Sequence, residues 1–309
     1  MTRGIQTRVR ARVAMSDLSI MNRVEELRQL ALAKVRANEM EDALALYDDA
    51  LAIAEDEEVR ELITINKADA LITLERTGPE VQDLARVIMR RRNPRHVYLA
   101  AYALQYKNRL EGEFKRALFY GQLALRSAEE TNDLSWKRAA LVDLGNVYEM
   151  DSQIAKAIEC FEEALTITDA SHGNGYDLLS RGYTLENLGY CKLLEGNVRE
   201  GIALIHDAAQ LLTDPLGTAE AYIDLCYGYL ELNDLERARF YGDAGLEVAR
   251  DNRQIRNAHY LLGEVAYKSG DSEAADYHFD CLAKFYPDFR HLKSLLFAID
   301  LRSMVNLKL

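Results

Sequence analysis

Proline and glycine are scarce in this sequence, and long apolar runs are missing. The chain of 309 residues contains four prolines and 17 glycines. Because these two residues most often interrupt helices, their scarcity favours an all-helical protein over a β-sheet or loop-rich one. A membrane-spanning helix needs about 18 or more consecutive apolar residues. The sequence has no such run, so we expect no transmembrane segment.

Cysteine and histidine are also few, and they are widely spaced. No two cysteines form a Cys-x-x-Cys pair, and no two histidines have the spacing of a metal-ligand pair. The one close combination, His278 with Cys281, is too small a set for a metal site. We therefore expect no metal and no cofactor, and four free, buried thiols of a reducing compartment. The cysteines are Cys160, Cys191, Cys226 and Cys281.

Motifs that mark catalytic centres are absent as well. The sequence contains no GxxxxGK[ST], GxGxxG or GxSxG, so neither a phosphate-binding loop nor a nucleophile elbow is indicated. Adjacent acidic residues such as Glu162 and Glu163 fall on predicted exposed helix faces, where they are ordinary solvated charges. The sequence does not predict an enzyme.

The chain has an excess of negative charge. Its formal net charge is -12, which disfavours general binding to nucleic acid or to anionic membranes. We expect a cytoplasmic protein whose partners are neutral or basic proteins or peptides. Residues 1–19 are basic and are predicted to form a flexible arm, with Met15 as a second candidate for the first residue. The run RRRNPR, from Arg90 to Arg95, could bind an acidic partner, but cations favoured at a helix C-terminus are the preferred interpretation.

A pattern of two helices joined by a short polar turn recurs along the chain. Each copy has a small residue early in its second helix and a small or medium one seven positions later, on the same helix face. The first set is Ala117, Ala157, Gly201, Ala238 and Ala275; the second is Ala124, Ala164, Ala208, Gly245 and Leu282. Members of the first set are 40, 44, 37 and 37 residues apart. Small side chains at these positions predict close packing of neighbouring helices.

The repeats extend toward the N-terminus, and proline or glycine residues mark several of their turns. Ala43 begins a similar segment, and residues 57–93 fit the interval that follows, with Pro79 at the start of a second helix. Gly112, Gly196 and Gly270 stand where a helix would end in the left-handed conformation. About seven helix pairs are therefore predicted.

These features resemble the tetratricopeptide repeat. The segment LGNVYEMDSQIAKAIECFEEAL (residues 144–165) has a Leu-Gly pair, a tyrosine, and then Ala, an aromatic residue and Ala; the last repeat ends in Tyr286-Pro287. The resemblance covers residues 20–287 and implies a right-handed superhelical solenoid, with residues 288–309 as a C-terminal capping helix. The long repeat period is similar to those of kinesin light chains and of bacterial peptide-sensing regulators.

The resemblance also implies that the first helix of each pair lines a concave, peptide-binding face. On that basis the residues expected to bind a peptide are Tyr102, Tyr106, Asp143, Asn146, Tyr183, Glu186, Asn187, Tyr190, Asp224, Tyr227 and Tyr260. Val142, Glu220 and Asp224 stand where chaperone-binding relatives need cations, so a carboxylate clamp is not expected.

Two kinds of residue in this set have alternative roles. Asn146 and Asn187 could each hold the main chain of an extended peptide, because an amide offers both a donor and an acceptor; alternatively they cap or bridge neighbouring helices. The tyrosines could form a contact surface or pack between helices. The function we expect is that of a protein-protein interaction adaptor. The alternative is a ligand-gated regulator of a separate enzyme or transcription factor.

Overall fold

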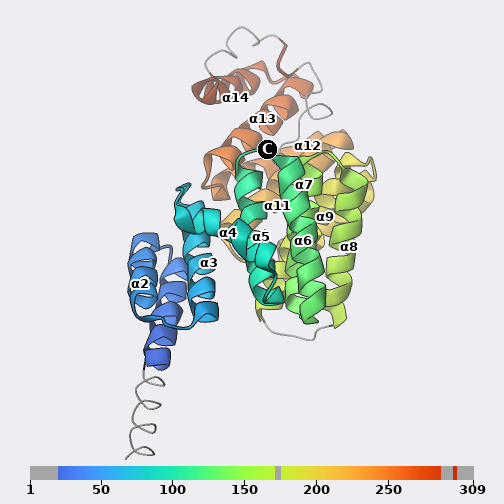
Figure 1. The fold of residues 1–309 in the computed structure, drawn as a ribbon. Coiled ribbons are helices and arrows are strands. Elements are labelled where there is room, and N and C mark those ends of the chain that lie inside the picture. The colour runs from blue at the N-terminus through green and yellow to red at the C-terminus, as the bar shows by residue number, and fades with distance from the viewer. Residues whose placement is uncertain (1–19, 171–174, 287–294, 298–309) are drawn as a thin grey trace, which may run out of the picture. The chain divides into compact units, whose positions relative to one another are not determined.

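The computed structural model describes residues 20–170, 175–286 and 295–297 (Figure 1). Within these ranges the secondary structure consists of helices and turns, with no strand, as the composition predicts. The predicted arm, residues 1–19, lies outside the described residues. So does most of the predicted capping segment 288–309.

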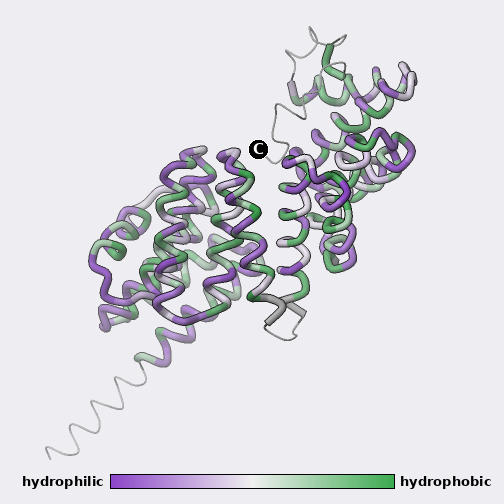
Figure 2. The backbone as a smooth tube through the Cα atoms, turned by 90° about the vertical axis from the view of Figure 1, so that its right-hand side faces the viewer, coloured by the Kyte–Doolittle hydropathy of each residue, from purple (hydrophilic) through white to green (hydrophobic). Residues whose placement is uncertain are grey.

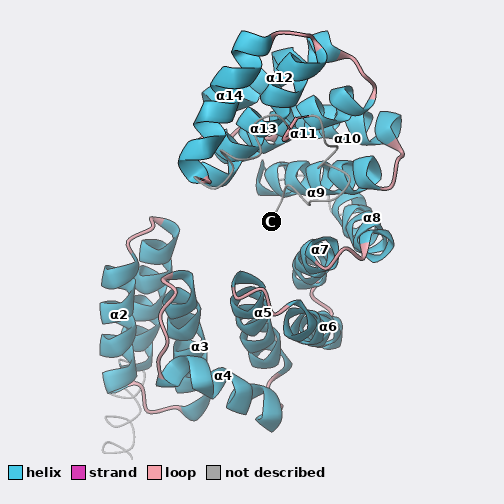
Figure 3. Cartoon of the chain, turned by 90° about the horizontal axis from the view of Figure 1, so that it is seen from above, coloured by secondary structure: helices cyan, strands magenta, loops and turns pink. Residues whose placement is uncertain are grey.

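The helices form consecutive antiparallel pairs (Figure 3). A helix over residues 20–36 precedes α2. The labelled helices are α2 (Met40–Ile53), α3 (Glu57–Thr73), α4 (Pro79–Arg90), α5 (Pro94–Leu110), α6 (Phe114–Thr131), α7 (Leu134–Met150), α8 (Ile154–Ala170), α9 (Gly175–Leu194), α10 (Val198–Leu211), α11 (Pro215–Glu231), α12 (Leu235–Val248), α13 (Asn252–Lys268) and α14 (Ser272–Phe285). The predicted set of seven helix pairs and the all-helical class are confirmed.

A turn of the same conformation joins the two helices of every described pair. In each, one residue has a positive φ, between 54° and 91°: Asn38, Glu75, Gly112, Ser152, Gly196, Asn233 and Gly270. The N–H of the next residue donates to the carbonyl five residues earlier, as from Glu113 to Asn108 at 2.9 Å and from Asp271 to Ala266 at 2.9 Å. This is the glycine-type helix cap, which satisfies carbonyls that the helix end leaves unpaired. These turn residues give every repeat a common origin for counting.

Small residues let the two helices of a pair approach closely. A Cβ added to Gly145 would lie 2.7 Å from the ring of Phe161, so the aromatic residue occupies the space that glycine leaves. A Cβ on Gly201 would lie 2.6 Å from the carbonyl oxygen of Gly189. Ala157 and Ala164 are fully buried. The predicted role of the small residues in helix packing is confirmed.

The described residues fall into two compact units, divided between Trp136 and Lys137 in the first turn of α7. We call residues 20–136 the N-terminal unit and the described residues from 137 onward the C-terminal unit. Each has its own apolar core, centred on residues such as Tyr47 and Ile63 in the first and Ile205 and Leu225 in the second. Along the helices of both, hydrophobic and hydrophilic residues alternate as expected for helices with one buried face (Figure 2).

A short C-terminal segment covers part of the last pair. Residues 295–297 form a turn in which Leu296 and Phe297 are 3% and 6% exposed. The ring of Phe297 lies 6.2 Å from that of Tyr260 on α13. These residues protect an apolar face of α13, whereas the rest of the predicted capping helix lies outside the described residues.

Candidate functional site

Counting back from the left-handed turn residues places the predicted site residues on one face of the first helices. They stand six, nine, ten or thirteen residues before the turn, and such spacings bring side chains to the same side of a helix. Position six holds Tyr106, Asn146, Tyr190 and Tyr227; position nine holds Asp143, Asn187 and Asp224; position ten holds Tyr102, Glu186 and Tyr260; position thirteen holds Tyr183.

The two asparagines form a hydrogen bond with each other. Nδ2 of Asn187 on α9 donates to Oδ1 of Asn146 on α7, across 3.1 Å, and both side chains are partly exposed. Asn146 stands at position six and Asn187 at position nine, so the two differ by about one helical turn. Bridging of neighbouring helices, one of the two alternatives, is thus observed. A role in holding a peptide stays a prediction.

The bond between the amides leaves part of each unused. The NH2 group of Asn146 and the carbonyl oxygen of Asn187 have no hydrogen-bond partner among the described residues. These are a donor and an acceptor, the two groups that a peptide main chain alternately requires. The pair therefore presents both kinds of group from adjacent helices.

Tyr183 stands beside this pair on α9, with its hydroxyl already bound. The hydroxyl donates to Oδ2 of Asp214, the N-cap of α11, across 2.7 Å. The same carboxylate oxygen accepts from the N–H of Gly217 at 2.9 Å. Burial, together with this hydrogen bond and the charge of Asp214, raises the pKa of Tyr183. The ring is held rigidly and stays partly exposed.

Glu186, Glu220 and Asp224 form a buried acidic cluster between α9 and α11. One carboxylate oxygen from each residue lies within 4.8 Å of those from the other two. The three residues are 2%, 8% and 2% exposed, in that order. Arg253 of α13 donates to both oxygens of Glu220, each at 2.8 Å. Burial lowers the pKa of Arg253, but its hydrogen bonds to Glu220 and the neighbouring acidic charges outweigh that effect and raise it.

This acidic cluster is a set of oxygen ligands of the kind that hard metal ions prefer. Arg253 already provides a cation to it, and Nε2 of Gln254 donates to Glu220 across 2.9 Å. We therefore assign the cluster to holding α11 and α13 together and propose no metal for it.

Three of the predicted tyrosines are buried. Tyr190, Tyr227 and Tyr260 are 0%, 5% and 7% exposed. The rings of Tyr190 and Tyr227 have centroids 6.0 Å apart, and Tyr260 packs near Phe297. Their positions correspond to the packing alternative, so a contact with a peptide would need their side chains to move.

Tyr102 and Tyr106 belong to the N-terminal unit and are partly exposed. The ring of Tyr102 lies 6.0 Å from that of Tyr98, and the guanidinium of Arg109 lies 5.3 Å from the ring centroid of Tyr106. Peptide binding by these two tyrosines stays a prediction for that unit alone.

The same counting identifies a residue that the sequence analysis missed. Asp69 on α3 stands six residues before Glu75, at the position that Asn146 occupies on α7. A glycine marks this turn in three other pairs, whereas Glu75 gives no such signal. Because no glycine marks this turn, the sequence alone does not show how residues 57–93 align with the other repeats.

The arginine run is paired with acidic residues. Arg90, the last residue of α4, and Arg92 lie 3.5 and 2.8 Å from Oε1 of Glu57, and Arg91 lies 3.3 Å from Glu130. This arrangement agrees with cations at a helix C-terminus.

Among the described helices, none combines the length and the apolar character required to cross a bilayer. No protein-family model matches the sequence, and no curated protein matches it.

Solved structures share the fold. A tetratricopeptide repeat protein from Parabacteroides merdae is 14% identical, with a TM-score of 0.59 over 90% of this chain and 100% of its own. A Rap protein complexed with competence and sporulation factor is 17% identical, with a TM-score of 0.65 over 92% of this chain and 78% of its own. A signal transduction ATPase with a tetratricopeptide repeat sensor, from Pyrococcus horikoshii, is 17% identical, with a TM-score of 0.67 over 90% and 45%. Identities this low establish the fold only.

Proposed function

The chain has the tetratricopeptide-repeat fold, and from that premise we propose that it is a protein-protein interaction adaptor. In this proposal the face formed by the first helices of the C-terminal unit binds an extended peptide segment of a partner protein. The protein makes and breaks no covalent bond; it presents a preformed surface, and it does so in the cytoplasm.

The observation that carries the proposal is the amide pair of Asn146 and Asn187. A purely structural bridge would need one hydrogen bond, yet a second donor and a second acceptor stay available at a partly exposed place. A peptide carbonyl can accept from Asn146 while a peptide N–H donates to Asn187. Since the 3.1 Å bond already fixes both side chains, little rotamer entropy is lost on binding.

The surroundings favour a neutral or basic peptide. Asp143 stands one turn before Asn146 on α7, and the buried carboxylates of Glu186 and Asp224 lie on the neighbouring helices. Electrostatic complementarity of this kind sets partner choice and association rate more than affinity. The partly exposed ring of Tyr183 adds an apolar contact of restricted mobility.

Selection from a random peptide display library tests the proposal on the full chain. We expect wild-type protein to enrich peptides with Lys or Arg, and Asn146→Ala with Asn187→Ala to bind those peptides at least about tenfold more weakly, a loss of about 1.4 kcal/mol. A matched control is Asn197→Ala, since Asn197 lies in the turn before α10 and bonds Glu195 there. Failure to enrich any peptide, or equal binding by the double variant, would refute the assignment.

A ligand-gated regulator is the second candidate. It is supported by the similarity to a Rap protein whose solved structure contains competence and sporulation factor. In such a protein the repeats would contract around a bound peptide, and this contraction would change their affinity for a separate protein chain. Small-angle scattering distinguishes the two: a selected peptide should reduce the radius of gyration of a regulator and leave that of an adaptor unchanged.

A further inference from the structure

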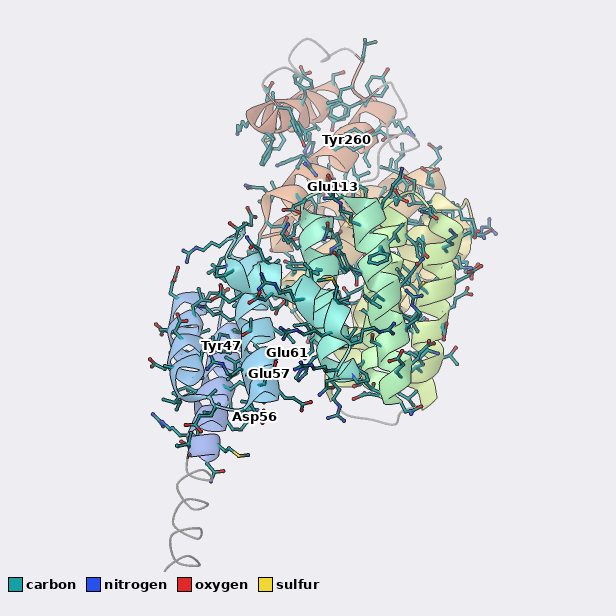
Figure 4. All side chains as sticks on the ribbon, viewed as in Figure 1. Tyr47, Asp56, Glu57, Glu61, Glu113 and Tyr260 are labelled. Atoms are coloured by element: carbon teal, nitrogen blue, oxygen red, sulfur yellow. The ribbon has the colours of Figure 1, made fainter. Side chains whose placement is uncertain are left out.

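A cavity of about 320 Å³ lies in the N-terminal unit, lined by the first turn of α4, the second half of α5 and the first half of α6. Its lining includes residues on both sides of the turn between α5 and α6, where Figure 4 labels Glu113. Sites for small ligands have volumes of about 300–1,000 Å³, so this cavity has room for one. All of its lining residues lie between Thr77 and Tyr120, so it is separate from the amide pair of the C-terminal unit.

The floor of the cavity is apolar. Val81 on α4 and Leu104 on α5 are 6% and 7% exposed and belong to the core of the N-terminal unit. The ring of Tyr120 on α6 packs against the same core. Because the core holds these side chains in place, the cavity is preformed, and an apolar group that enters it removes apolar surface from water.

Both charged residues that line the cavity are cations. They are Lys107 and Arg116, and no acidic side chain of the described residues lines it, although the chain has a net charge of -12. Lys107 already donates to both oxygens of Glu111, each at 2.7 Å. The guanidinium of Arg116, an exposed residue, has no hydrogen bond or ion pair within the described part of the chain. Arg116 is therefore the cation that is available to a ligand.

Two further groups favour an anion at the same place. Gly78 is the N-cap of α4 and lines the cavity with the positive end of that helix, to which it offers no side-chain oxygen. Asn108 is 6% exposed, and its Nδ2 donates to the carbonyl oxygen of Leu104 across 2.6 Å, which leaves the second hydrogen of this amide for a ligand. Glu80, in the first turn of α4, bonds Lys67 at 2.7 Å and does not line the cavity. Hydrogen-bond donors and positive charge thus stand beside an apolar floor.

We propose that this cavity binds a small organic acid, with its carboxylate at Arg116 and its apolar part against Val81 and Leu104. A guanidinium can donate two parallel hydrogen bonds to a carboxylate. The amide of Asn108 supplies a further donor, and the apolar part of the acid displaces water from the floor. The site lies in the N-terminal unit and does not depend on the peptide-binding proposal for the C-terminal unit.

Titration of the ¹⁵N-labelled full chain with small probes tests the proposal by NMR. Hexanoate and 3-phenylpropionate carry a carboxylate on an aliphatic and an aromatic group; hexanamide and 3-phenylpropanamide are their neutral counterparts of similar shape. We expect saturable shifts of the amide signals of residues 77–82 and 104–108 with at least one of the two acids, and at least about tenfold weaker binding of the matching amide. The acid that binds more tightly identifies the kind of apolar group that the cavity accepts.

Two variants and a matched control assign the effect to this cavity. Arg116→Gln should weaken binding of the acid at least about tenfold, since it removes the charge of the guanidinium. Thr77→Trp should also weaken it at least about tenfold, because Thr77 is an exposed residue that lines the cavity and a large side chain there takes up the space. Arg126→Gln, at another exposed arginine of α6 that does not line the cavity, should change nothing.

Four results would overturn the proposal. They are the absence of saturable shifts with both acids, equal binding of an acid and its amide, equal binding by the wild type and Arg116→Gln, and equal binding by the wild type and Thr77→Trp. Because the probes and all the variants concern the N-terminal unit, each result stands whatever the outcome of the peptide selection.

Discussion

Asn187 donates a hydrogen bond to Asn146 across 3.1 Å and so joins α9 to α7 through side chains that are still partly exposed. The bond is part of the scaffold, and the unused donor and acceptor of the same amides are available to a ligand. Stability and binding can therefore be measured separately at this pair.

The amide pair should contribute little to the free energy of unfolding, and both asparagines contribute through the same hydrogen bond. Asn146→Ala or Asn187→Ala should each lower the free energy of unfolding by about 1 kcal/mol, since a partly exposed hydrogen bond between neutral groups is lost. The double variant should cost less than the sum of the two, because the second substitution removes a partner that is already unpaired. Urea unfolding measures all three. Strict additivity would mean that the amides do not interact in solution.

The ion pair of Arg253 with Glu220 should contribute far more to the free energy of unfolding than the amide pair does. Arg253→Met leaves the carboxylate of Glu220 buried beside Glu186 and Asp224 without its cation. We expect a loss of about 2–4 kcal/mol, below the upper range for fully buried pairs because the Arg253 side chain is 32% exposed. Glu220→Gln in the same chain should recover part of it.

The control for this prediction is Arg239→Met. Arg239 lies 3.7 Å from Asp271, and both side chains are more than 40% exposed. Such a pair contributes about 0–1 kcal/mol. Comparable effects in the two variants would show that the acidic cluster is not held by Arg253.

Two buried histidines should make the C-terminal unit sensitive to acid. Nδ1 of His259 on α13 lies 3.0 Å from Nδ1 of His278 on α14, which requires one nitrogen to be unprotonated. Burial, the charge of His278 and the charge of Lys284 together lower the pKa of His259 to about 4. Burial and the charge of Arg239 lower the pKa of His278, and the charge of Asp271 opposes them.

Since these pKa values are lower in the folded protein than the ordinary 6.5, the unfolded chain binds more protons. Stability from this pair is complete above pH 6.5 and is lost as the pH falls toward 4, by on the order of 2 kcal/mol. Urea midpoints between pH 7 and 4.5 should fall more steeply for the wild type than for His259→Leu with His278→Leu. Parallel curves would contradict the assignment.

Asp69 should show the opposite dependence. Its pKa is raised from 3.8 to about 6 by burial, so the folded protein binds the extra proton and stability decreases as the pH rises through this interval. Asp69→Asn should therefore stabilise the protein at pH 8, by on the order of 1–2 kcal/mol, and have little effect below pH 4. If the substitution lowers the thermal unfolding midpoint at pH 8, the ionised carboxylate stabilises the folded protein and burial does not raise its pKa.

Much of the fold could be predicted from the sequence because glycine residues mark the turns of several repeats. Gly112, Gly196 and Gly270 mark left-handed turns, and the turn residues confirm that interpretation. Glu75 and Ser152 adopt the same conformation against their intrinsic preference, which sequence patterns do not signal. Tertiary packing imposes it there.

The site was less predictable, since position along a helix does not determine exposure. Tyr190 and Tyr106 occupy the same position in their repeats, yet Tyr190 is fully buried and Tyr106 partly exposed. The difference depends on neighbouring helices whose side chains are far away in sequence. Asp69 was missed because its repeat lacks the glycine that aligned the others.

The most direct test of the proposed groove uses backbone-methylated peptides. A peptide selected on the wild-type chain would be N-methylated at one residue at a time, and each analogue titrated calorimetrically against the wild type and Asn187→Ala. If Asn187 accepts from a peptide N–H, methylation at one position should weaken binding to the wild type at least about tenfold and leave binding to the variant unchanged. Equal losses in both proteins at every position would contradict the central claim that this amide holds the main chain of a ligand.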